Sequence, residues 1–428
     1  MKPQNLPEKL IWFYILGTYP IYYIGGLYLF APLLAAYLFF YLIKQWWNQT
    51  DDTPYDDRIE LSAPAWVWLG CMSIVAFAAV IGGIDFDLPL SKIIFTLVNR
   101  WFRTWALMAI FPVIGHLNIR PQLIYRAVCI FCIQSLILVP IFTACYYLFN
   151  AYDYGFVSPL SKFGGGVIFY VVKVFGSTLD VTEKRLQMIA PWPPALGLVG
   201  DLFFCLCLQE TNKKLKVLGM AGAAALTFGS ISRMAIFCLI VIIPTTWVLS
   251  NVTKSWLQFT LSGIFFGSAV FYSSLKEKID AIILSVRQFR SGSTRAREAI
   301  QQLAMNAWRQ DAPIWGHGTF SENGPASVGF RGIGSHHTWL GLLYAHGIVG
   351  ALPLAIAFAW SFFDLLTKLG THKHAVVGLS ILIILIIFSF EDNIDGLAYL
   401  YWPSLIVLGI AFKENVHLKP NSSKMIYT

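Results

Sequence analysis

The chain has 428 residues, of which 57% are hydrophobic and only 13% are charged, whereas a soluble domain is typically about one quarter charged. Apolar runs of roughly 20 residues, long enough to cross a bilayer, recur along its whole length. This composition excludes an ordinary soluble protein and predicts an all-α polytopic membrane protein. The net charge of +8 lies in connectors and loops, which favours membrane lipids and phosphorylated substrates as partners rather than nucleic acid.

Apolar runs separated by polar breaks predict about twelve transmembrane helices. In chain order they cover residues 10–24, 26–46, 63–83, 101–118, 122–149, 192–209, 214–230, 232–250, 254–274, 337–366, 375–391 and 396–412. We expect the first to be retained, because no small-residue cleavage site follows a short apolar stretch. Cys129 and Cys132 form a C-x-x-C inside one apolar helix, and we expect them to pack rather than to bind a metal.

The distribution of Lys and Arg among the short loops predicts that both termini are cytoplasmic. The inner loops would then be NIRPQLIYR, QETNKKLK, SNVTKS, TKLGTHKH and the tail KENVHLKPNSSK. The predicted organisation is helices in 1–150, an outer loop in 151–191, four helices in 192–274, a large outer loop in 275–336, and three helices with the tail in 337–428. Because the long loops face away from cytosolic ATP and sugar nucleotides, an energy-rich substrate would have to be preassembled and membrane-delivered.

The large outer loop carries a cluster of arginines. Its STRAREAIQQLAMNAWRQ segment has apolar residues at helical spacing, which predicts an amphipathic helix. Guanidinium groups bind phosphate oxygens in a bidentate manner, so we interpret the cluster as a phosphate site. A solvated helix face or a lipid-headgroup anchor is the alternative. The cluster consists of Arg287, Arg290, Arg295 and Arg297.

Two further arginines are candidate substrate ligands. Arg185 precedes the Pro-rich start of a helix in VTEKRLQMIAPWPPALG, where it is either a ligand or an interfacial basic residue. Arg233 lies in SISRMAIFCLI, at the outer end of an apolar hairpin. An arginine at such a depth is costly and is usually functional or paired, so we predict that Arg233 binds a phosphate.

Polar residues at two other outer turns have open interpretations. In FSFEDNIDGLAY, three carboxylates are candidates to pair with the arginines, to cap the next helix or to act as a general base: Glu391, Asp392 and Asp395. In PIWGHGTF, Gly316 and Gly318 predict a tight turn close to a ligand or to a packed helix.

The segment GIGSHHTWLGLLYAHGIVG places His336 and His337 where an apolar helix begins. A histidine, with a pKa near 6.5, can take a proton from a hydroxyl nucleophile. Neighbouring helical residues point about 100° apart, so one imidazole would act while the other packs or caps. The alternative is that both are only polar residues at a helix start.

These motifs together resemble the O-antigen ligase and polysaccharide-polymerase family, which consists of bacterial membrane glycosyltransferases of the C-type superfamily. The family signature runs roughly R-x(n)-P-x-x-G-x-G, then H-N-S-[YF]-L and G-x-x-G. The similar residues here are Arg297 or Arg295, Pro313, Gly316, Gly318, His336 to Leu340, Gly347 and Gly350, preceded by Arg185, Pro193, Pro194, Gly197, Ser232 and Arg233. His337 stands where the family usually has Asn, and YAHG lacks the acidic residue often found before its glycine. The register to Gly347 favours His336 as the family's histidine, with His337 as the alternative.

The resemblance implies metal-independent transfer of a glycan from undecaprenyl pyrophosphate at the periplasmic face of the bacterial inner membrane, with no cofactor. A ligase would use lipid A–core as the acceptor, and a polymerase would use another lipid-linked glycan. The histidine would deprotonate the acceptor hydroxyl, which attacks with inversion while the arginines bind the diphosphate. We favour the ligase, because one dominant outer loop carries both the arginine cluster and the histidines. A transporter is the less favoured class, because no inverted repeat is visible.

Overall fold

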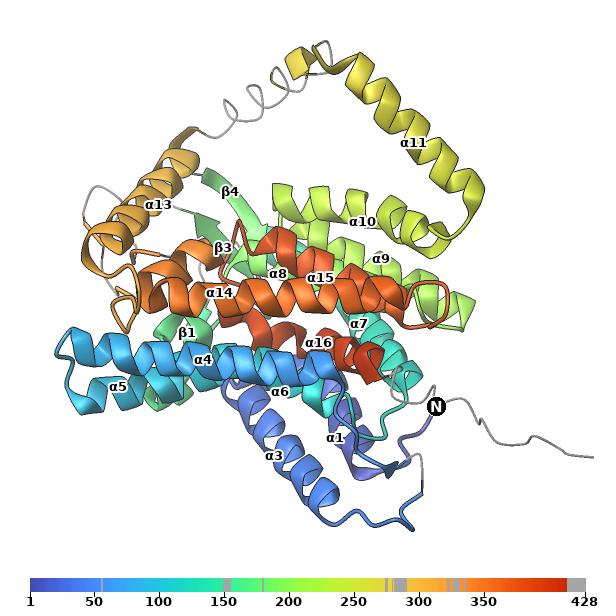
Figure 1. Ribbon diagram of the computed structural model, residues 1–428, viewed down its shortest axis with the longest axis horizontal. Coiled ribbons are helices and arrows are strands. Elements are labelled where there is room, and N and C mark those ends of the chain that lie inside the picture. The colour runs from blue at the N-terminus through green and yellow to red at the C-terminus, as the bar shows by residue number, and fades with distance from the viewer. Residues whose placement is uncertain are drawn as a thin grey trace, which may run out of the picture.

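The computed structural model describes residues 1–413 except 55–56, 149–154, 179–180, 274–275, 279, 281–290, 322–323, 326–331 and 335. Its elements, in chain order, are α1 (Leu6–Leu16), α2 (Thr18–Tyr23), α3 (Leu27–Trp47), α4 (Ala63–Asp85), α5 (Leu90–Thr96), the π-helix η2 (Leu97–Trp105), α6 (Ala106–Ile114), α7 (Pro121–Leu148), β1 (Gly155–Val157), η3 (Pro159–Phe163), η4 (Val167–Tyr170), β2 (Val171–Lys173), β3 (Phe175–Thr178), β4 (Val181–Leu186), α8 (Pro193–Cys207), α9 (Lys213–Gly229), α10 (Arg233–Asn251), α11 (Ser255–Val270), α13 (Ser291–Asp311), α14 (Thr338–Thr367), α15 (Ala375–Phe388), η6 (Asp395–Leu397) and α16 (Ala398–Lys413). The fold is thus mostly helical (Figure 1).

Most predicted spans coincide with one helix each, but two do not. The span predicted at 10–24 is divided at Gly17 into α1 and α2. The span predicted at 101–118 begins earlier, because α5, η2 and α6 form one continuous helix from Leu90. Arg103, which lies inside the predicted span, is buried and donates to the carbonyls of Phe163 and Gly164.

Six helices in the described part of the chain are long and apolar enough to cross a membrane: α3, α4, α7, α10, α14 and η6 with α16. The apolar helices α8 and α15 are shorter. The protein therefore has the architecture of a multi-pass membrane protein. The prediction of twelve spans stays a prediction.

The first predicted outer loop contains two small antiparallel hairpins. Strand β1 pairs with β2, with Phe156 opposite Val172. Strand β3 pairs with β4, with Gly176 opposite Arg185. The sequence analysis did not predict these strands, although valine and phenylalanine are enriched in this segment and favour strands.

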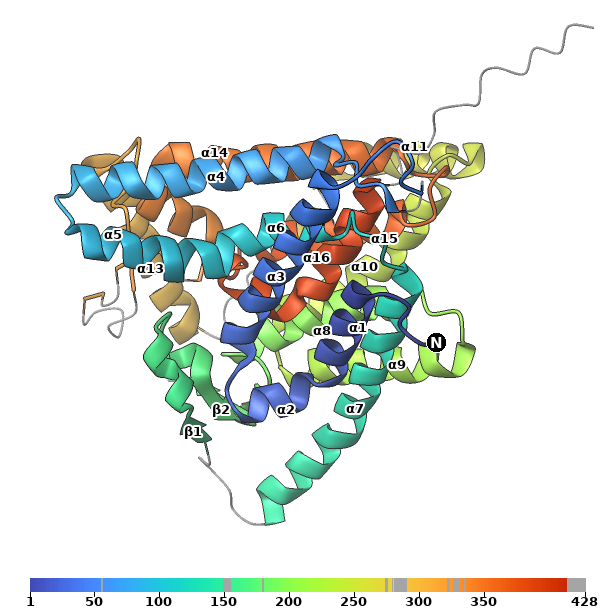
Figure 2. The ribbon, with the colours of Figure 1, turned by 90° about the horizontal axis from the view of Figure 1, so that it is seen from below.

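The segments predicted as inner loops contact one another at one end of the bundle. The guanidinium of Arg126 pairs with the carboxylate of Glu210 at 2.8 Å, and the hydroxyl of Tyr125 lies 3.0 Å from Nδ1 of His374. The hairpins and α13 lie at the opposite end (Figure 2). These loops therefore share one face, and its assignment to the cytoplasm stays a prediction.

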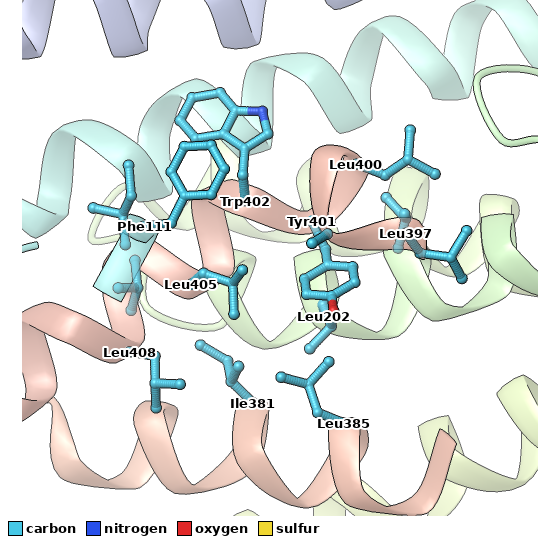
Figure 3. Close-up of a cluster of buried hydrophobic side chains, with 14 of the residues drawn as sticks. Phe111, Leu202, Ile381, Leu385, Leu397, Leu400, Tyr401, Trp402, Leu405 and Leu408 are labelled. Atoms are coloured by element: carbon cyan, nitrogen blue, oxygen red, sulfur yellow. The ribbon is translucent and has the colours of Figure 1, made fainter. Parts of the chain in front are cut away.

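Helix α16 is the centre of the core. Its candidate span is 94% buried, and its aromatic and leucine side chains pack among α6, α8 and α15 (Figure 3). Glycines permit the closest crossings, as is common between membrane helices. A Cβ on Gly409 would overlap the backbone of Pro112 in α6. In α7, the predicted packing of Cys129 and Cys132 is observed, because both are buried and lie against glycines of α9.

Candidate functional site

A break in α14 is filled by the loop that precedes this helix. Gly347 has φ of 61°, which interrupts the helical hydrogen bonds. The freed carbonyls of Tyr344 and Ala345 accept from the backbone N–H groups of His317 and Gly318, at 3.0 and 2.9 Å. The freed N–H groups of Ile348 and Val349 donate to the carbonyls of Pro313 and Ile314, at 3.1 and 3.2 Å. All four backbone groups are thus satisfied across the break.

The glycines of this loop are required by close packing. Gly316 and Gly318 have φ of 71° and 70°, a region in which a Cβ is unfavourable. A Cβ on Gly82 of α4 would lie 2.7 Å from the carbonyl oxygen of Gly316. The PIWGHG turn is therefore pressed between α4 and α14, which is the packed-helix alternative of the sequence reading. This packing fixes the N-terminal part of α14, which begins directly after the two histidines.

His337 is the N-cap of α14. Its Nδ1 accepts from the backbone N–H of Leu340 at 3.3 Å, and its own backbone N–H donates to Oδ1 of Asn393 at 2.9 Å. Burial lowers the pKa of His337, so its imidazole is neutral at pH 7 and can act as an acceptor. With the Nδ1 lone pair committed to the helix, the ring proton resides on Nε2.

His336 has a different backbone geometry. Its φ of 63° lies in the left-handed region, which non-glycine residues rarely adopt. Such strain costs roughly 1–3 kcal/mol and tends to occur at functional positions. The histidine pair therefore separates into a capping residue and a strained residue that directly precedes it.

The segment between α15 and η6 holds the start of α14 in place. Thr338 donates through its hydroxyl to the carbonyl of Asp392 at 2.6 Å and accepts from the N–H of Ile394 at 3.1 Å. The indole of Trp192 donates to the carboxylate of Asp392 at 2.6 Å. Burial raises the pKa of Asp392, although this hydrogen bond opposes the shift. Asp392 thus connects the start of α8 to the start of α14.

Arg297 pairs with one of the candidate carboxylates. Its guanidinium lies 2.6 Å from the carboxylate of Glu391, and both side chains are about one third exposed (33% and 39%). The pair joins α13 to the segment after α15. Among the three carboxylates that the sequence left open, Glu391 therefore takes the ion-pairing role.

Arg185 and Arg233 lie close to the turn between α9 and α10. On β4, Arg185 is buried, and its Nε has no hydrogen-bond partner in the described part of the chain. The neighbouring Leu186 packs against Gly229 at the end of α9. After the turn, Arg233 is the exposed first residue of α10. A cation there adds to the positive end of the helix dipole, which weakens the helix and attracts anions.

The side chains of the three remaining predicted arginines are not among those that the structure describes. Arg287 and Arg290 lie outside the described residues. Arg295 lies in α13, but its side chain is not among those described. The predicted amphipathic helix itself is confirmed: α13 packs on α14 through Ala304, which contacts Tyr344 and Ala345.

A pocket of about 130 Å³ lies beside the histidines. It contains Arg100 from η2, a residue that the sequence reading passed over, because it treated the residues before Trp101 as a loop. The pocket also contains Asn393, which accepts the hydrogen bond from His337. Its described lining consists of Tyr28, Arg100, Thr104, Gly165, Phe169, Trp192, Phe320, Ser321, Gly332, Ile333, Asn393, Asp395 and Gly396.

In a comparison with known proteins, one family model matches the middle of the chain. Residues 218–355 match the model of the family described as O-antigen ligase (Wzy_C), so this region is an O-antigen ligase family domain. It includes Arg233, α13, the PIWGHG turn and both histidines, whereas Arg185 and Arg100 precede it. Members of this family are ligases or polymerases that transfer lipid-linked glycans. No curated protein matches the chain.

Proposed function

We propose that this chain, which carries an O-antigen ligase family domain, is the ligase that completes lipopolysaccharide. It transfers a preassembled polysaccharide from undecaprenyl pyrophosphate to lipid A–core, at the periplasmic face of the inner membrane. The observation that carries the proposal is the arrangement at the start of α14. There, inside the family domain, His337 bonds to Asn393, which lines a pocket with Arg100, and Arg297 pairs with Glu391 two residues before Asn393.

The donor pyrophosphate is assigned to the arginines. Arg185 supports this assignment best, because a buried guanidinium with an unbonded Nε is suited to an anionic ligand. Arg233 supports it through its position at the start of α10, where backbone N–H groups also favour an anion. Arg297 and the cluster residues Arg287, Arg290 and Arg295 are proposed to guide and hold the same diphosphate.

The general base is assigned to His336. His337 uses its Nδ1 lone pair to cap α14, which leaves Nε2 protonated and unable to accept a proton. His336 accepts the proton of the acceptor hydroxyl as that oxygen attacks the anomeric carbon opposite the pyrophosphate. The new glycosidic bond forms, the bond to the pyrophosphate oxygen breaks, and the arginines stabilise the charge on the departing lipid pyrophosphate. The reaction inverts the anomeric configuration and requires no metal ion.

Deletion of the gene tests the choice of acceptor. A ligase mutant accumulates long lipid-linked chains and makes bare lipid A–core, both visible by gel electrophoresis and mass spectrometry of extracted lipids. Core that carries a single repeat unit would instead identify a polymerase. Expression of the intact chain in the mutant should restore capped lipopolysaccharide.

Purified protein tests the reaction class. The expected result is glycan transfer from undecaprenyl pyrophosphate to lipid A–core in detergent with EDTA and without ATP. Movement of the donor across vesicle membranes with no covalent product would reject the enzyme proposal in favour of a transporter.

A further inference from the structure

The pocket beside the histidines has walls of two kinds. In the first kind, the rings of Tyr28 and Phe169 are stacked with centroids 4.3 Å apart, and the Trp192 ring lies 6.1 Å from Phe169. In the second kind, the guanidinium carbon of Arg100 lies 5.9 Å from the ring centroid of Phe320. All five residues line the same pocket.

Charged and uncharged polar groups also line this pocket. Arg100 contributes a cation, and the buried Asp395 contributes a carboxyl group. Asn393, Thr104 and Ser321 add an amide and two hydroxyl groups. A pyrophosphate would face the buried carboxyl group of Asp395 as well as Arg100. A neutral polyhydroxyl compound uses both donors and acceptors.

The rigidity of this pocket also indicates a binding site. Tyr28 donates to the backbone of η2 at 3.2 Å and accepts the guanidinium of Arg103 over its ring at 5.7 Å. Trp192 is held by Asp392. Aromatic surfaces with a few fixed polar groups are typical of preformed ligand sites.

We propose that this pocket binds a sugar ring of the acceptor. The apolar face of the ring lies on Phe169 and Trp192, and its hydroxyl groups bond to Arg100, Asn393 and Asp395. Asn393 lines the pocket and bonds to the backbone of His337, so a sugar there has its reactive hydroxyl beside the histidines. This inference rests on the function proposed above, and it assigns Arg100 and Asp395 to acceptor recognition, separate from the arginines that hold the donor.

Kinetics of purified variants test this assignment. We expect Arg100→Gln to raise the KM for lipid A–core about tenfold or more, the effect of losing one hydrogen bond to a charged group, and to leave the KM for the lipid pyrophosphate donor within about twofold. Lys92→Gln, an exposed change on the preceding helix α5, is the matched control and should change neither value. A rise in the donor KM alone would assign the pocket to the donor sugar and overturn the proposal, as would no change in either KM.

Direct binding separates this inference from the proposed function. Lipid A–core is titrated into His336→Asn, which lacks the proposed base, with and without Arg100→Gln. Ser321→Trp in the same background fills the pocket without altering η2, and should abolish acceptor binding even if Arg100→Gln fails to fold. If the pocket variants lose acceptor binding and the wild type makes no transfer product, the ligase function is rejected and the pocket assignment is retained. Unaltered binding in Ser321→Trp would overturn the assignment.

Discussion

Nδ1 of His337 accepts a hydrogen bond from the backbone N–H of Leu340 at 3.3 Å, so this histidine performs the capping function that asparagine usually provides at a helix start. His336, directly before it, has left-handed backbone geometry. The two histidines are adjacent in sequence but occupy different structural positions.

The same substitution at the two positions distinguishes their roles. Asparagine tolerates positive φ, so His336→Asn removes the imidazole without adding backbone strain. We expect it to reduce kcat about 10²- to 10⁴-fold, whereas His337→Asn keeps the cap and most of the activity. The measurement is transfer to lipid A–core, with thermal unfolding as the check on folding. An active His336→Asn and an inactive His337→Asn would move the base to His337, and two active variants would remove the general-base proposal.

The cap of α14 is expected to weaken in acid. Burial lowers the pKa of His337 in the folded chain, so below the ordinary value of about 6.5 the unfolded chain binds a proton that the folded chain resists. Stability contributed at this position is therefore present above that pH and falls as the pH decreases through it. We expect the decrease in Tm between pH 7.5 and 5.5 to be smaller in His337→Asn than in the wild type. Equal decreases would contradict the capping role.

Substitution of Arg185 or Arg233 should weaken binding of the lipid pyrophosphate donor. Arg233→Ala is expected to raise the KM for the lipid pyrophosphate, and Arg233→Lys to restore it only in part, because lysine lacks the bidentate geometry. Arg185→Lys should be impaired similarly. The control is Arg309→Ala, which removes an exposed charge near the end of α13 and should leave the donor KM unchanged. Full rescue by lysine would show that these residues contribute only positive charge and that bidentate geometry is not required.

The ion pair between Arg297 and Glu391 is expected to stabilise the protein only weakly. Partly exposed pairs typically contribute less than about 1 kcal/mol, so a double-mutant cycle of Arg297→Gln and Glu391→Gln by thermal unfolding should give a coupling below that value. Glu391→Gln should retain catalysis if Glu391 is only a partner of Arg297. A loss of activity in Glu391→Gln as large as that in His336→Asn would return this carboxylate to the list of candidate bases.

The break in α14 is expected to require glycine. A Cβ on Gly347 would overlap the carbonyl of Ile314, and an alanine at its positive φ costs about 1–3 kcal/mol before any clash. We expect Gly347→Ala to lower Tm and the amount of folded protein in the membrane. Gly263→Ala, in α11, has no atom within 4 Å of the added Cβ and should be neutral or slightly stabilising. Equal behaviour of the two variants would show that the turn does not depend on this glycine.

Most of the helices could be predicted from the sequence, because apolar runs, polar breaks and amphipathic spacing are local properties of the chain. It also identified the residue types suited to phosphate binding and proton transfer, and the O-antigen ligase family domain. It placed the start of the helix that contains Arg100 at residue 101, whereas this helix begins at Leu90, because the segment before Trp101 was interpreted as a connector.

Only the tertiary structure separated His336 from His337, since the cap depends on where α14 begins and on the position of Asn393. It alone explained why the glycines of PIWGHG occur with Gly347, because each segment satisfies backbone groups that the other leaves open. It also brought Arg100, Trp192 and Asp395 to one pocket. These relationships join residues far apart in the chain, and no local pattern encodes which unpaired groups and cavities will meet when the helices pack.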